Sequence, residues 1–286
     1  MNIRNLGIVG AGQMGRGIAV VAARSGLEVL MHDVREELLQ QGMKSIGEFL
    51  DKEISRGQGT ETDKSAILQR VQTCTNLGDL QSTDFVIEAA TENEAVKFQI
   101  FRDLDRICAP AALLSSNTSS IPIGRIAAQT HRPDKVIGMH FMNPAPAIKL
   151  VEVIRSLTTS EETFKATCDL VERMGKIPAE ARDFPGFISN RILMTMINEA
   201  VFTLYEGVGS REAIDMVMHW GMNHPMGPLA LADLIGLDTC LAVMETMYDG
   251  YKDARYRPCP LLRQYVDAGR LGRKAGRGFY EYDRAR

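Results

Sequence analysis

Leu6-Gly-Ile-Val-Gly-Ala-Gly-Gln-Met-Gly15 joins an apolar run to three closely spaced glycines, and the fold of the N-terminal half follows from it. The apolar run predicts a buried parallel strand. Gly10, Gly12 and Gly15 then form the pattern G-x-G-x-x-G. In this pattern the first glycine permits a tight turn, the second lets the backbone approach a pyrophosphate, and the third allows close packing of a helix on the strand. The stretch therefore predicts a dinucleotide-binding loop.

The residues after the glycines support this interpretation. Gln13 and Met14 open the expected helix, whose free N–H groups would face the phosphates. Apolar residues continue at helical spacing to Gly26, and residues 28–32 predict a second strand that leads into Asp33. A carboxylate at that place can accept hydrogen bonds from both ribose hydroxyls and would repel a 2′-phosphate. Asp33 therefore favours NAD over NADP.

Basic residues beyond Asp33 leave two questions open. The guanidinium of Arg35 could meet a 2′-phosphate if the loop turned it inward, which keeps NADP as an alternative. Two helices are expected over residues 35–57 and 62–71. They could offer a basic side chain to a phosphate, or they could form a solvated charged face. The candidates on the first of these helices are Lys44, Lys52 and Arg56.

Composition limits the classes of function. The chain has 286 residues, enough for two domains, and a formal net charge of −3, which does not favour nucleic acid or an anionic membrane surface as partner. The five cysteines are scattered without a C-x-x-C pair, which is typical of reduced thiols in the cytoplasm. The sequence predicts no signal segment and no bilayer-spanning run. The spacing of the histidines predicts no metal site.

Two further apolar runs, residues 84–90 and 112–116, predict strands with polar residues at their ends. Loops at the carboxyl ends of strands in an open α/β sheet hold ligands, which makes Glu92 and Lys97 candidate functional residues. A helix-start acid and a surface lysine are the alternative. Residues 117–120, Asn-Thr-Ser-Ser, make a polar floor for a ligand, although an N-cap for the next helix would explain one or two of them.

His140 and Glu152 are the candidate acid/base pair. Each lies in an expected strand, and two adjacent strands joined by a turn could bring the two side chains into contact. A carboxylate can hold an imidazole in one tautomer and stabilise its protonated form, as a general acid/base requires. A buried histidine satisfied by any neighbour is the alternative. The acid in an apolar strand favours the pair, because burial without a partner would be costly.

A domain boundary is expected at residues 183–187, Asp-Phe-Pro-Gly-Phe, because proline and glycine end the α/β pattern there. We predict a Rossmann-type doubly wound sheet over residues 1–184 and an all-α domain over residues 185–286. Helices are expected over residues 187–205, 211–220, 229–248 and 261–268. Asn190 falls in the first turn of the first of these helices, where its amide could reach a cleft.

The helical part also carries many methionines and an aromatic tail. The methionines could fill an adaptable core or form part of a subunit interface, and we expect an interface for part of this surface. They are Met216, Met218, Met222, Met244 and Met247. Residues 272–282 form a basic glycine-rich loop followed by an aromatic tail that is expected to pack on the helices.

Taken together, these motifs resemble the short-chain 3-hydroxyacyl-CoA dehydrogenase family, particularly its bacterial 3-hydroxybutyryl-CoA dehydrogenases. The resemblance covers the whole chain. It rests on Gly-Ala-Gly-Gln-Met-Gly, Ser-Asn-Thr-Ser-Ser, His-Phe-Met-Asn-Pro, Lys-Leu-Val-Glu-Val-Ile, Asp-Phe-Pro-Gly-Phe, Asn-Arg-Ile, Asn-His-Pro-Met-Gly-Pro and Gly-Arg-Gly-Phe-Tyr, in that order. It implies a nucleotide-binding domain, a helical dimerisation domain, and an active site in the cleft between them.

The resemblance also implies roles for particular residues. His140 would be the catalytic acid/base and Glu152 its orienting partner. Ser119 and Asn190 would contact the reacting oxygen or thioester of the substrate. Three further positions, Glu92, Lys97 and Asn143, look like cofactor or pocket contacts, with Ser119 close to both ligands. The helical pair around Lys52 looks like the coenzyme A contact region.

The activity implied is the reversible NAD-dependent oxidation of an (S)-3-hydroxyacyl-CoA, particularly 3-hydroxybutyryl-CoA, to a 3-oxoacyl-CoA. We expect a homodimer formed through the helical domain, with a higher oligomer as the alternative, and a cytoplasmic location. One alternative is a dehydrogenase of a free hydroxy acid, which would keep Asp33, His140 and Glu152 but need no coenzyme A. The other is a non-catalytic NAD-binding relative. Cofactor binding without turnover of any hydroxyacyl substrate would indicate it.

Overall fold

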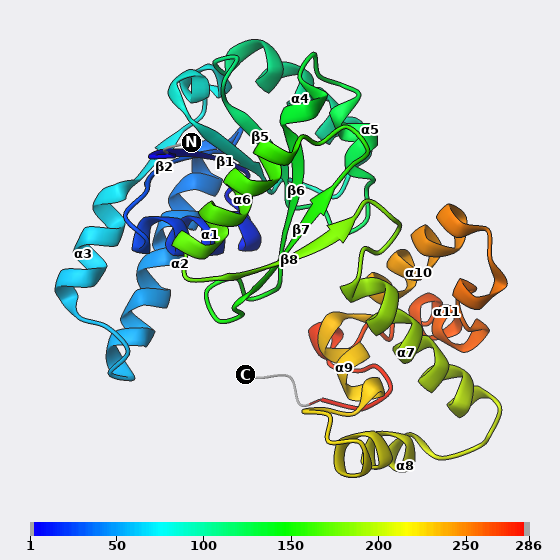
Figure 1. Cartoon of the computed structure of the whole chain (residues 1–286). Helices are drawn as coiled ribbons and strands as arrows, with labels where there is room; N and C mark the ends of the chain where they lie inside the picture. Colours follow the sequence, from blue (N-terminus) through cyan, green and yellow to red (C-terminus); the bar gives the residue numbers. More distant parts are fainter. Residues whose placement is uncertain (1–2, 283–286) are drawn as a thin grey trace. The chain divides into compact units, whose positions relative to one another are not determined.

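The computed structural model describes residues 3–282. The chain forms two compact units, the first ending at Asp183 and the second beginning at Phe184. The first unit is an α/β layer structure and the second is helical (Figure 1). This confirms the expected fold class, a doubly wound sheet followed by a helical C-terminal part.

The first unit is built on one eight-stranded sheet with the order β3-β2-β1-β4-β5-β6-β7-β8. Strands β1 to β6 are parallel, whereas β7 runs antiparallel to β6 and pairs in parallel with β8. The strands are β1 (Asn5–Val9), β2 (Glu28–His32), β3 (Val71–Cys74), β4 (Phe85–Glu88), β5 (Leu113–Ser116), β6 (Val136–Phe141), β7 (Leu150–Arg155) and β8 (Ile177–Arg182).

Helices cover both faces of this sheet. They are α1 (Gln13–Arg24), α2 (Glu36–Ser55), α3 (Glu61–Arg70), α4 (Glu94–Ile107), α5 (Ile123–Ala127) and α6 (Glu161–Arg173). Helices α1 and α6 share one hydrophobic core, and the right-handed crossovers after β4 and β5 place α4 and α5 on the opposite face (Figure 1). The strand order reverses between β1 and β4, which makes the carboxyl ends of these strands the switch point where α/β sheets bind ligands.

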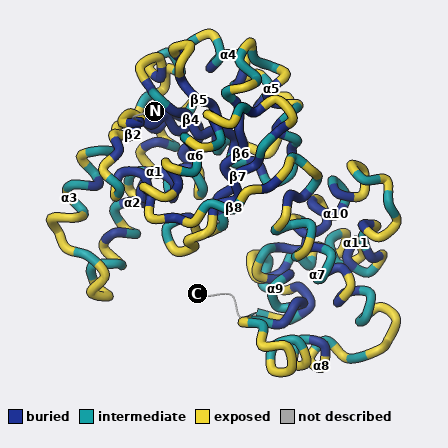
Figure 2. The backbone as a smooth tube through the Cα atoms, viewed as in Figure 1, coloured by how far each residue is buried: buried dark blue, intermediate teal, exposed yellow. Residues whose placement is uncertain are grey.

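Burial follows the layers of the first unit. The strands β1, β4, β5 and β6 are almost wholly buried, as expected for parallel strands covered on both faces (Figure 2). The outer ends of α2 and α3 are exposed, and α3 begins with a capping box between Thr60 and Asp63. Helix α6 is capped by Ser160, whose hydroxyl accepts the N–H of Thr163 at 3.1 Å. The hydroxyl of Thr159 instead donates to the carbonyl of Val136 in β6.

The second unit packs five helices around its own core. They are α7 (Ser189–Tyr205), α8 (Arg211–Met216), α9 (Pro228–Ile235), α10 (Leu237–Tyr251) and α11 (Pro260–Asp267). The expectation of one helix over residues 229–248 is wrong. Gly236, with φ of +106°, ends α9 and precedes α10, a conformation that a residue with a side chain rarely adopts.

The aromatic tail packs on these helices, as predicted. Phe279 is fully buried, and the carboxylate of Asp233 accepts the N–H groups of Phe279 and Tyr280 at 2.9 Å each and the hydroxyl of Tyr282 at 3.0 Å. Burial raises the pKa of Asp233 against the effect of these hydrogen bonds. Gly278 lies so close that a Cβ built there would approach Asp233 Oδ1 to 1.9 Å. The tail sequence thus needs a glycine before its aromatic residues.

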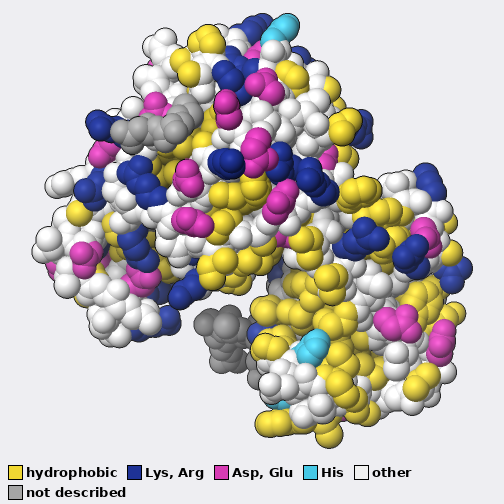
Figure 3. Space-filling model, in the orientation of Figure 1, with side chains coloured by type: hydrophobic (Ala, Val, Ile, Leu, Met, Phe, Trp, Pro, Cys, Tyr) yellow, Lys and Arg dark blue, Asp and Glu magenta, His cyan; other side chains and the backbone are white. Residues whose placement is uncertain are grey.

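The methionines of the second unit differ in burial. Met244 and Met247 are buried in the core, whereas Met216 and Met222 are exposed to 59% and 60%. Figure 3 shows apolar side chains gathered on the visible face of the second unit. The exposed large apolar residues of this unit include Ile192, Val208, Met216, Val217, Trp220 and Met222, which we call the apolar surface of the second unit.

Candidate active site

The glycine loop forms a cradle at the carboxyl end of β1. Gly10 has φ of +109°, and a Cβ there would lie 2.7 Å from the carbonyl oxygen of Ala89 in the neighbouring chain segment. A Cβ at Gly15 would lie 1.8 Å from the carbonyl oxygen of Gly10. In contrast, a Cβ at Gly12 would meet no described atom within 4 Å. The backbone at Gly12 is therefore open on the side from which a pyrophosphate would approach, at the uncapped start of α1.

Asp33 follows β2 and lies beside this cradle. One carboxylate oxygen, Oδ2, accepts the N–H of Ala11 at 2.8 Å, which ties the acid to the glycine loop. The side chain is half-buried, and Val34 and Arg35 beyond it are exposed. A carboxylate fixed in this way can still accept hydrogen bonds from ribose hydroxyls, so the residues present fit NAD.

Gln13 connects the cradle with the segment after β6. Its side-chain amide donates to Oδ1 of Asn143 at 3.1 Å, and both residues are exposed at this contact. Met14, the other residue between the last two glycines, packs partly buried against the hydrophobic core. Two predicted cofactor contacts from distant parts of the sequence, Gln13 and Asn143, are thus in contact with each other.

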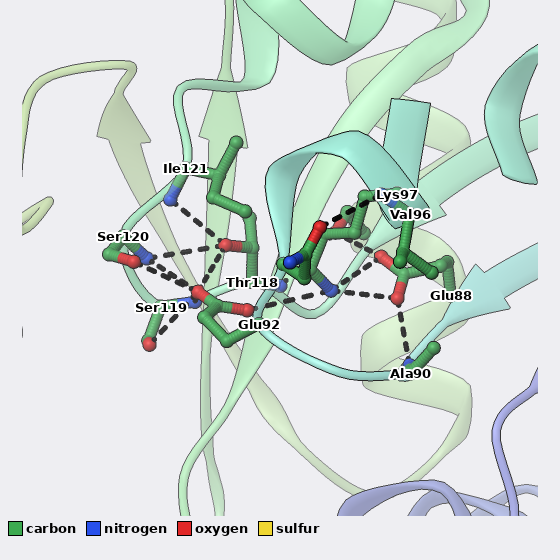
Figure 4. A network of polar contacts seen from close by, with 11 residues as sticks. Glu88, Ala90, Glu92, Val96, Lys97, Thr118, Ser119, Ser120 and Ile121 are labelled. Atoms are coloured by element: carbon green, nitrogen blue, oxygen red, sulfur yellow. Dashed lines mark hydrogen bonds and ion pairs between the residues drawn. The ribbon is translucent and has the colours of Figure 1, made fainter. Parts of the chain in front are cut away.

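Glu92 organises the loop that follows β5. Its oxygen Oε1 accepts the hydroxyl of Thr118 at 2.6 Å, the N–H groups of Ser119 and Ser120 at 3.0 and 3.2 Å, and the hydroxyls of the same serines at 3.3 and 3.0 Å (Figure 4). Burial opposes ionisation, but the charge of Lys97 and these hydrogen bonds hold the pKa of Glu92 below its ordinary value. Glu92 is therefore an anion that binds the predicted polar floor.

Lys97 is not a surface residue, so that alternative is wrong. Only 1% of its side chain is exposed, and its ammonium donates to both oxygens of Glu88 at 2.7 and 2.8 Å (Figure 4). The ammonium also lies 3.5 Å from Oε2 of Glu92. Glu88 was not predicted from the sequence. It could have been, because it is an acid within an apolar strand, which is the feature that made Glu152 a candidate.

His140 and Glu152 are in contact. They stand opposite each other in the antiparallel register of β6 and β7, and His140 Nδ1 lies 2.8 Å from Glu152 Oε2. The exposed fractions of the two side chains are 10% and 1%. The carboxylate can hold the Nδ1–H tautomer, in which Nε2 is the ring nitrogen that can accept a proton. Beside the pair, Asn117 accepts the N–H of Phe141 through Oδ1 at 2.8 Å and so fixes the end of β6.

Asn190 belongs to the second unit, where it lies half-buried in the first turn of α7. Its predicted contact with substrate stays a prediction. Of the basic candidates on α2, Lys44 forms an exposed ion pair with Glu48 at 4.0 Å and Lys52 is exposed near the helix end. Both therefore have the environment of a solvated charged face.

An open glycine cradle and an imidazole held by a carboxylate, at one edge of a doubly wound sheet, are what a nicotinamide-dependent dehydrogenase requires. In such an enzyme a glycine cradle binds the dinucleotide, and an imidazole can exchange the proton that accompanies hydride transfer.

The chain belongs to the 3-hydroxyacyl-CoA dehydrogenase family. Residues 5–184 match the family model "3-hydroxyacyl-CoA dehydrogenase, NAD binding domain", and residues 186–282 match "3-hydroxyacyl-CoA dehydrogenase, C-terminal domain". The protein is accordingly an oxidoreductase with NAD as its cofactor. No helix within residues 3–282 is long and apolar enough to cross a membrane.

Relatives with assigned names match this chain over almost its full length. The chain is 55% identical to a probable 3-hydroxybutyryl-CoA dehydrogenase of Bacillus subtilis, covering 99% of both chains. It is 52% identical to a 3-hydroxybutyryl-CoA dehydrogenase of Bradyrhizobium diazoefficiens, covering 98% of this chain and 96% of the relative. A crystal structure of an (S)-3-hydroxybutyryl-CoA dehydrogenase from Ralstonia eutropha matches with a TM-score of 0.97 and 50% identity, covering 99% of this chain and 100% of that one.

Proposed function

We propose that this protein catalyses the reversible oxidation of (S)-3-hydroxybutyryl-CoA to acetoacetyl-CoA with NAD, using His140 and Glu152 as its acid/base pair. The observation that carries the proposal is the 2.8 Å contact between His140 Nδ1 and Glu152 Oε2 at the ligand-binding edge of the sheet. The names of the relatives at 52–55% identity support the substrate.

In the oxidation, Nε2 of His140 accepts the proton of the 3-hydroxyl group as the C3–O bond becomes a carbonyl. Glu152 accepts the hydrogen bond of Nδ1–H and stabilises the imidazolium that forms. In the reduction, the same imidazolium returns the proton to the carbonyl oxygen. When bound, NAD supplies the hydride acceptor for the hydrogen on C3.

The cofactor is held by the residues of the cradle and of two further loops. Gly10, Gly12, Gln13, Met14 and Gly15 would hold the pyrophosphate, and Asp33 would accept hydrogen bonds from the hydroxyls of the adenosine ribose. At the nicotinamide end, Glu92, Ser119 and Asn143 line the site.

Ser119, Asn143 and Asn190 also serve the substrate. Ser119 and Asn190 contribute a hydroxyl and an amide to the reacting oxygen or the thioester, and Asn143 lines the pocket. Because each side chain can donate a hydrogen bond to a carbonyl oxygen, the set suits a 3-oxoacyl thioester. The first unit is then the cofactor domain and the second the substrate and dimerisation domain.

The test follows NADH absorbance after purified protein is mixed with acetoacetyl-CoA and NADH. We expect rapid loss of NADH, and formation of NADH when (S)-3-hydroxybutyryl-CoA and NAD are supplied instead. NADPH and free acetoacetate serve as controls and should react slowly. Turnover of free acetoacetate without the thioester would contradict the substrate, and absence of turnover with either would contradict the activity.

The homodimer rests on the apolar surface of the second unit. Trp220 is exposed to 79% and Val217 to 57%, and monomeric proteins seldom leave such residues clustered in contact with water. We expect sedimentation equilibrium to give twice the mass of the chain, and Val217→Asp to shift the mass toward the monomer. The described cysteines are free thiols, which supports the proposed cytoplasmic location.

A further inference from the structure

Glu88 is a buried carboxylate whose hydrogen-bonding capacity is filled. It ends β4, beside the glycine loop that follows β1, and its side chain is 0% exposed. Oε1 accepts the N–H of Ala90 and the ammonium of Lys97, both at 2.7 Å. Oε2 accepts the hydroxyl of Ser116 at 2.6 Å and the same ammonium at 2.8 Å. A carboxylate with two bonds on each oxygen has no free site for substrate, so Glu88 holds other groups in place.

Glu88 binds the ammonium of Lys97. An ammonium has three donors, of which two are directed at Glu88 and the third faces Glu92 Oε2 at 3.5 Å. Burying this charge without an anion would be very costly, and Glu88 supplies the anion. With its donors used in this way, Lys97 can act on a ligand through Glu92.

Glu92 is the end of the chain of charges that reaches the surface. Its side chain is 40% exposed, against 1% for Lys97 and 0% for Glu88. Oε2 faces the ammonium, while Oε1 gathers the backbone and hydroxyl groups of Thr118, Ser119 and Ser120 (Figure 4). A glutamate on an exposed loop would otherwise sample several rotamers, and the fixed ammonium restricts them.

We propose that Glu88 is a positioning residue of the active site, which fixes the carboxylate of Glu92 through Lys97 and thereby the loop Thr118–Ser120 that receives the nicotinamide end of the cofactor. The statement that this loop receives the nicotinamide end of the cofactor rests on the proposed function. The distance from Glu88 to the loop is bridged by two ion contacts, so the effect needs no movement of the strands. A purely structural pair would instead stabilise the fold without affecting the cofactor.

The decisive variant is the double substitution Glu88→Gln with Lys97→Met. A buried ion pair can be replaced by uncharged residues with little loss of stability, whereas removal of one partner leaves an unpaired buried charge. We therefore expect each single variant to melt at a lower temperature and the double variant to recover most of that loss. Glu94→Gln is the matched control, because Glu94 lies on the same helix as Lys97 and its substitution removes only an exposed ion pair with Arg125 of α5.

Despite its recovered stability, the double variant should bind NADH about tenfold more weakly than the wild type, as expected for loss of hydrogen bonds fixed by a charged group. Its kcat should fall as well, and KM should rise more for NADH than for acetoacetyl-CoA. The control Glu94→Gln should match the wild type in each measurement. If the double variant binds NADH as the wild type does, the pair is only structural and the proposal is overturned.

Two arrangements keep the test decisive. NADH affinity is measured by fluorescence titration without substrate, so failure of the wild type to reduce acetoacetyl-CoA would defeat the proposed function and leave this test intact. If the double variant does not fold, the single variant Ser116→Ala serves as the test. It changes no charge, and it removes both the hydrogen bond that Ser116 donates to Glu88 and the one that Ser116 accepts from the N–H of Thr118. We expect NADH binding about fivefold weaker in Ser116→Ala. Unchanged binding would overturn the proposal.

Discussion

Two histidines of the first unit meet a carboxylate in the same geometry but in opposite surroundings. His140 Nδ1 lies 2.8 Å from Glu152, and His131 Nδ1 lies 2.8 Å from Asp105. The exposed fraction of the side chain is 10% for His140 and 98% for His131. Water surrounds the second imidazole, whereas the first lies in the protein at the carboxyl edge of the sheet, where α/β sheets bind ligands. A histidine and an acid at hydrogen-bond distance therefore do not by themselves indicate catalysis.

The acids in the two pairs also differ in what else they hold. Asp105 on α4 accepts the backbone N–H of His131 at 2.9 Å and Nε of Arg132 at 2.8 Å, so it fastens a loop to a helix. Burial opposes ionisation, but hydrogen bonds from the backbone and side chain of His131 and from Arg132 hold the pKa of Asp105 below its ordinary value. Glu152 instead stands in a strand, in register with the histidine it contacts. We expect Asp105 to serve stability and Glu152 to serve the reaction.

Replacement of the buried histidine should have the largest effect. His140→Gln removes the acid/base group, and a positioned general acid/base contributes about 10²–10⁴ in rate, so kcat should fall by that factor. NADH affinity should change little, as measured by fluorescence titration beside steady-state kinetics. The matched control is His131→Gln, which removes an imidazole from an equivalent carboxylate and should keep wild-type turnover. Normal turnover in His140→Gln would refute the catalytic assignment.

The substitution Glu152→Gln should have the second-largest effect on kcat. The amide keeps the size of the side chain and can still accept from Nδ1–H, but it cannot stabilise an imidazolium by charge. We expect kcat to fall about 10²-fold, below the loss of an essential base but well above the effect of a surface change. A variant whose kcat equals that of the wild type would show that Glu152 only fills space.

Asp105→Asn should act on stability alone. The loop at His131 and Arg132 loses charge-assisted hydrogen bonds, which we expect to lower the free energy of unfolding by about 1–3 kcal/mol. Urea unfolding followed by circular dichroism measures this loss, and kcat of the folded variant should remain unchanged. A fall in kcat when all of the variant is folded would mean that the contact between Asp105 and His131 affects the active site.

The smallest expected effect is the pH dependence of the difference in unfolding free energy between the wild type and Asp105→Asn. The pKa of Asp105 is lower in the folded protein than its ordinary value of about 3.9. Its contribution to stability is therefore fully present above the ordinary value and is lost as the pH falls through the folded pKa. The stability gap between wild type and Asp105→Asn should shrink in that acidic range. A gap that stays constant there would show that the charge of Asp105 contributes nothing.

The glycine loop, Asp33 and the contact between His140 and Glu152 could be predicted, because the local sequence determines them. Gly10 and Gly15 are fixed by backbone crowding, and Asp33 by its place after the second strand. His140 and Glu152 lie in apolar strands on either side of a short connection, which makes antiparallel pairing the simplest arrangement. In each case the constraint lies within one or two neighbouring elements.

Other features depend on contacts that the sequence does not display. The strands β3 and β8 were missed because both lie at sheet edges, where polar residues replace the continuous apolar run of a buried strand. The burial of Lys97 depends on Glu88, which lies on another element of the sheet. Glu88 could have been found by the reasoning that found Glu152, since an isolated acid in a buried strand needs a partner.

The register of β6 and β7 decides which changes in chain length the site can tolerate. The residues between Phe141 and Leu150 form the connection, and the ladder fixes His140 opposite Glu152 whatever path that connection takes. A residue inserted within either strand would turn every later side chain of that strand to the other face of the sheet and separate the pair. Variation in length among related chains is therefore expected in the connection and excluded from the two strands.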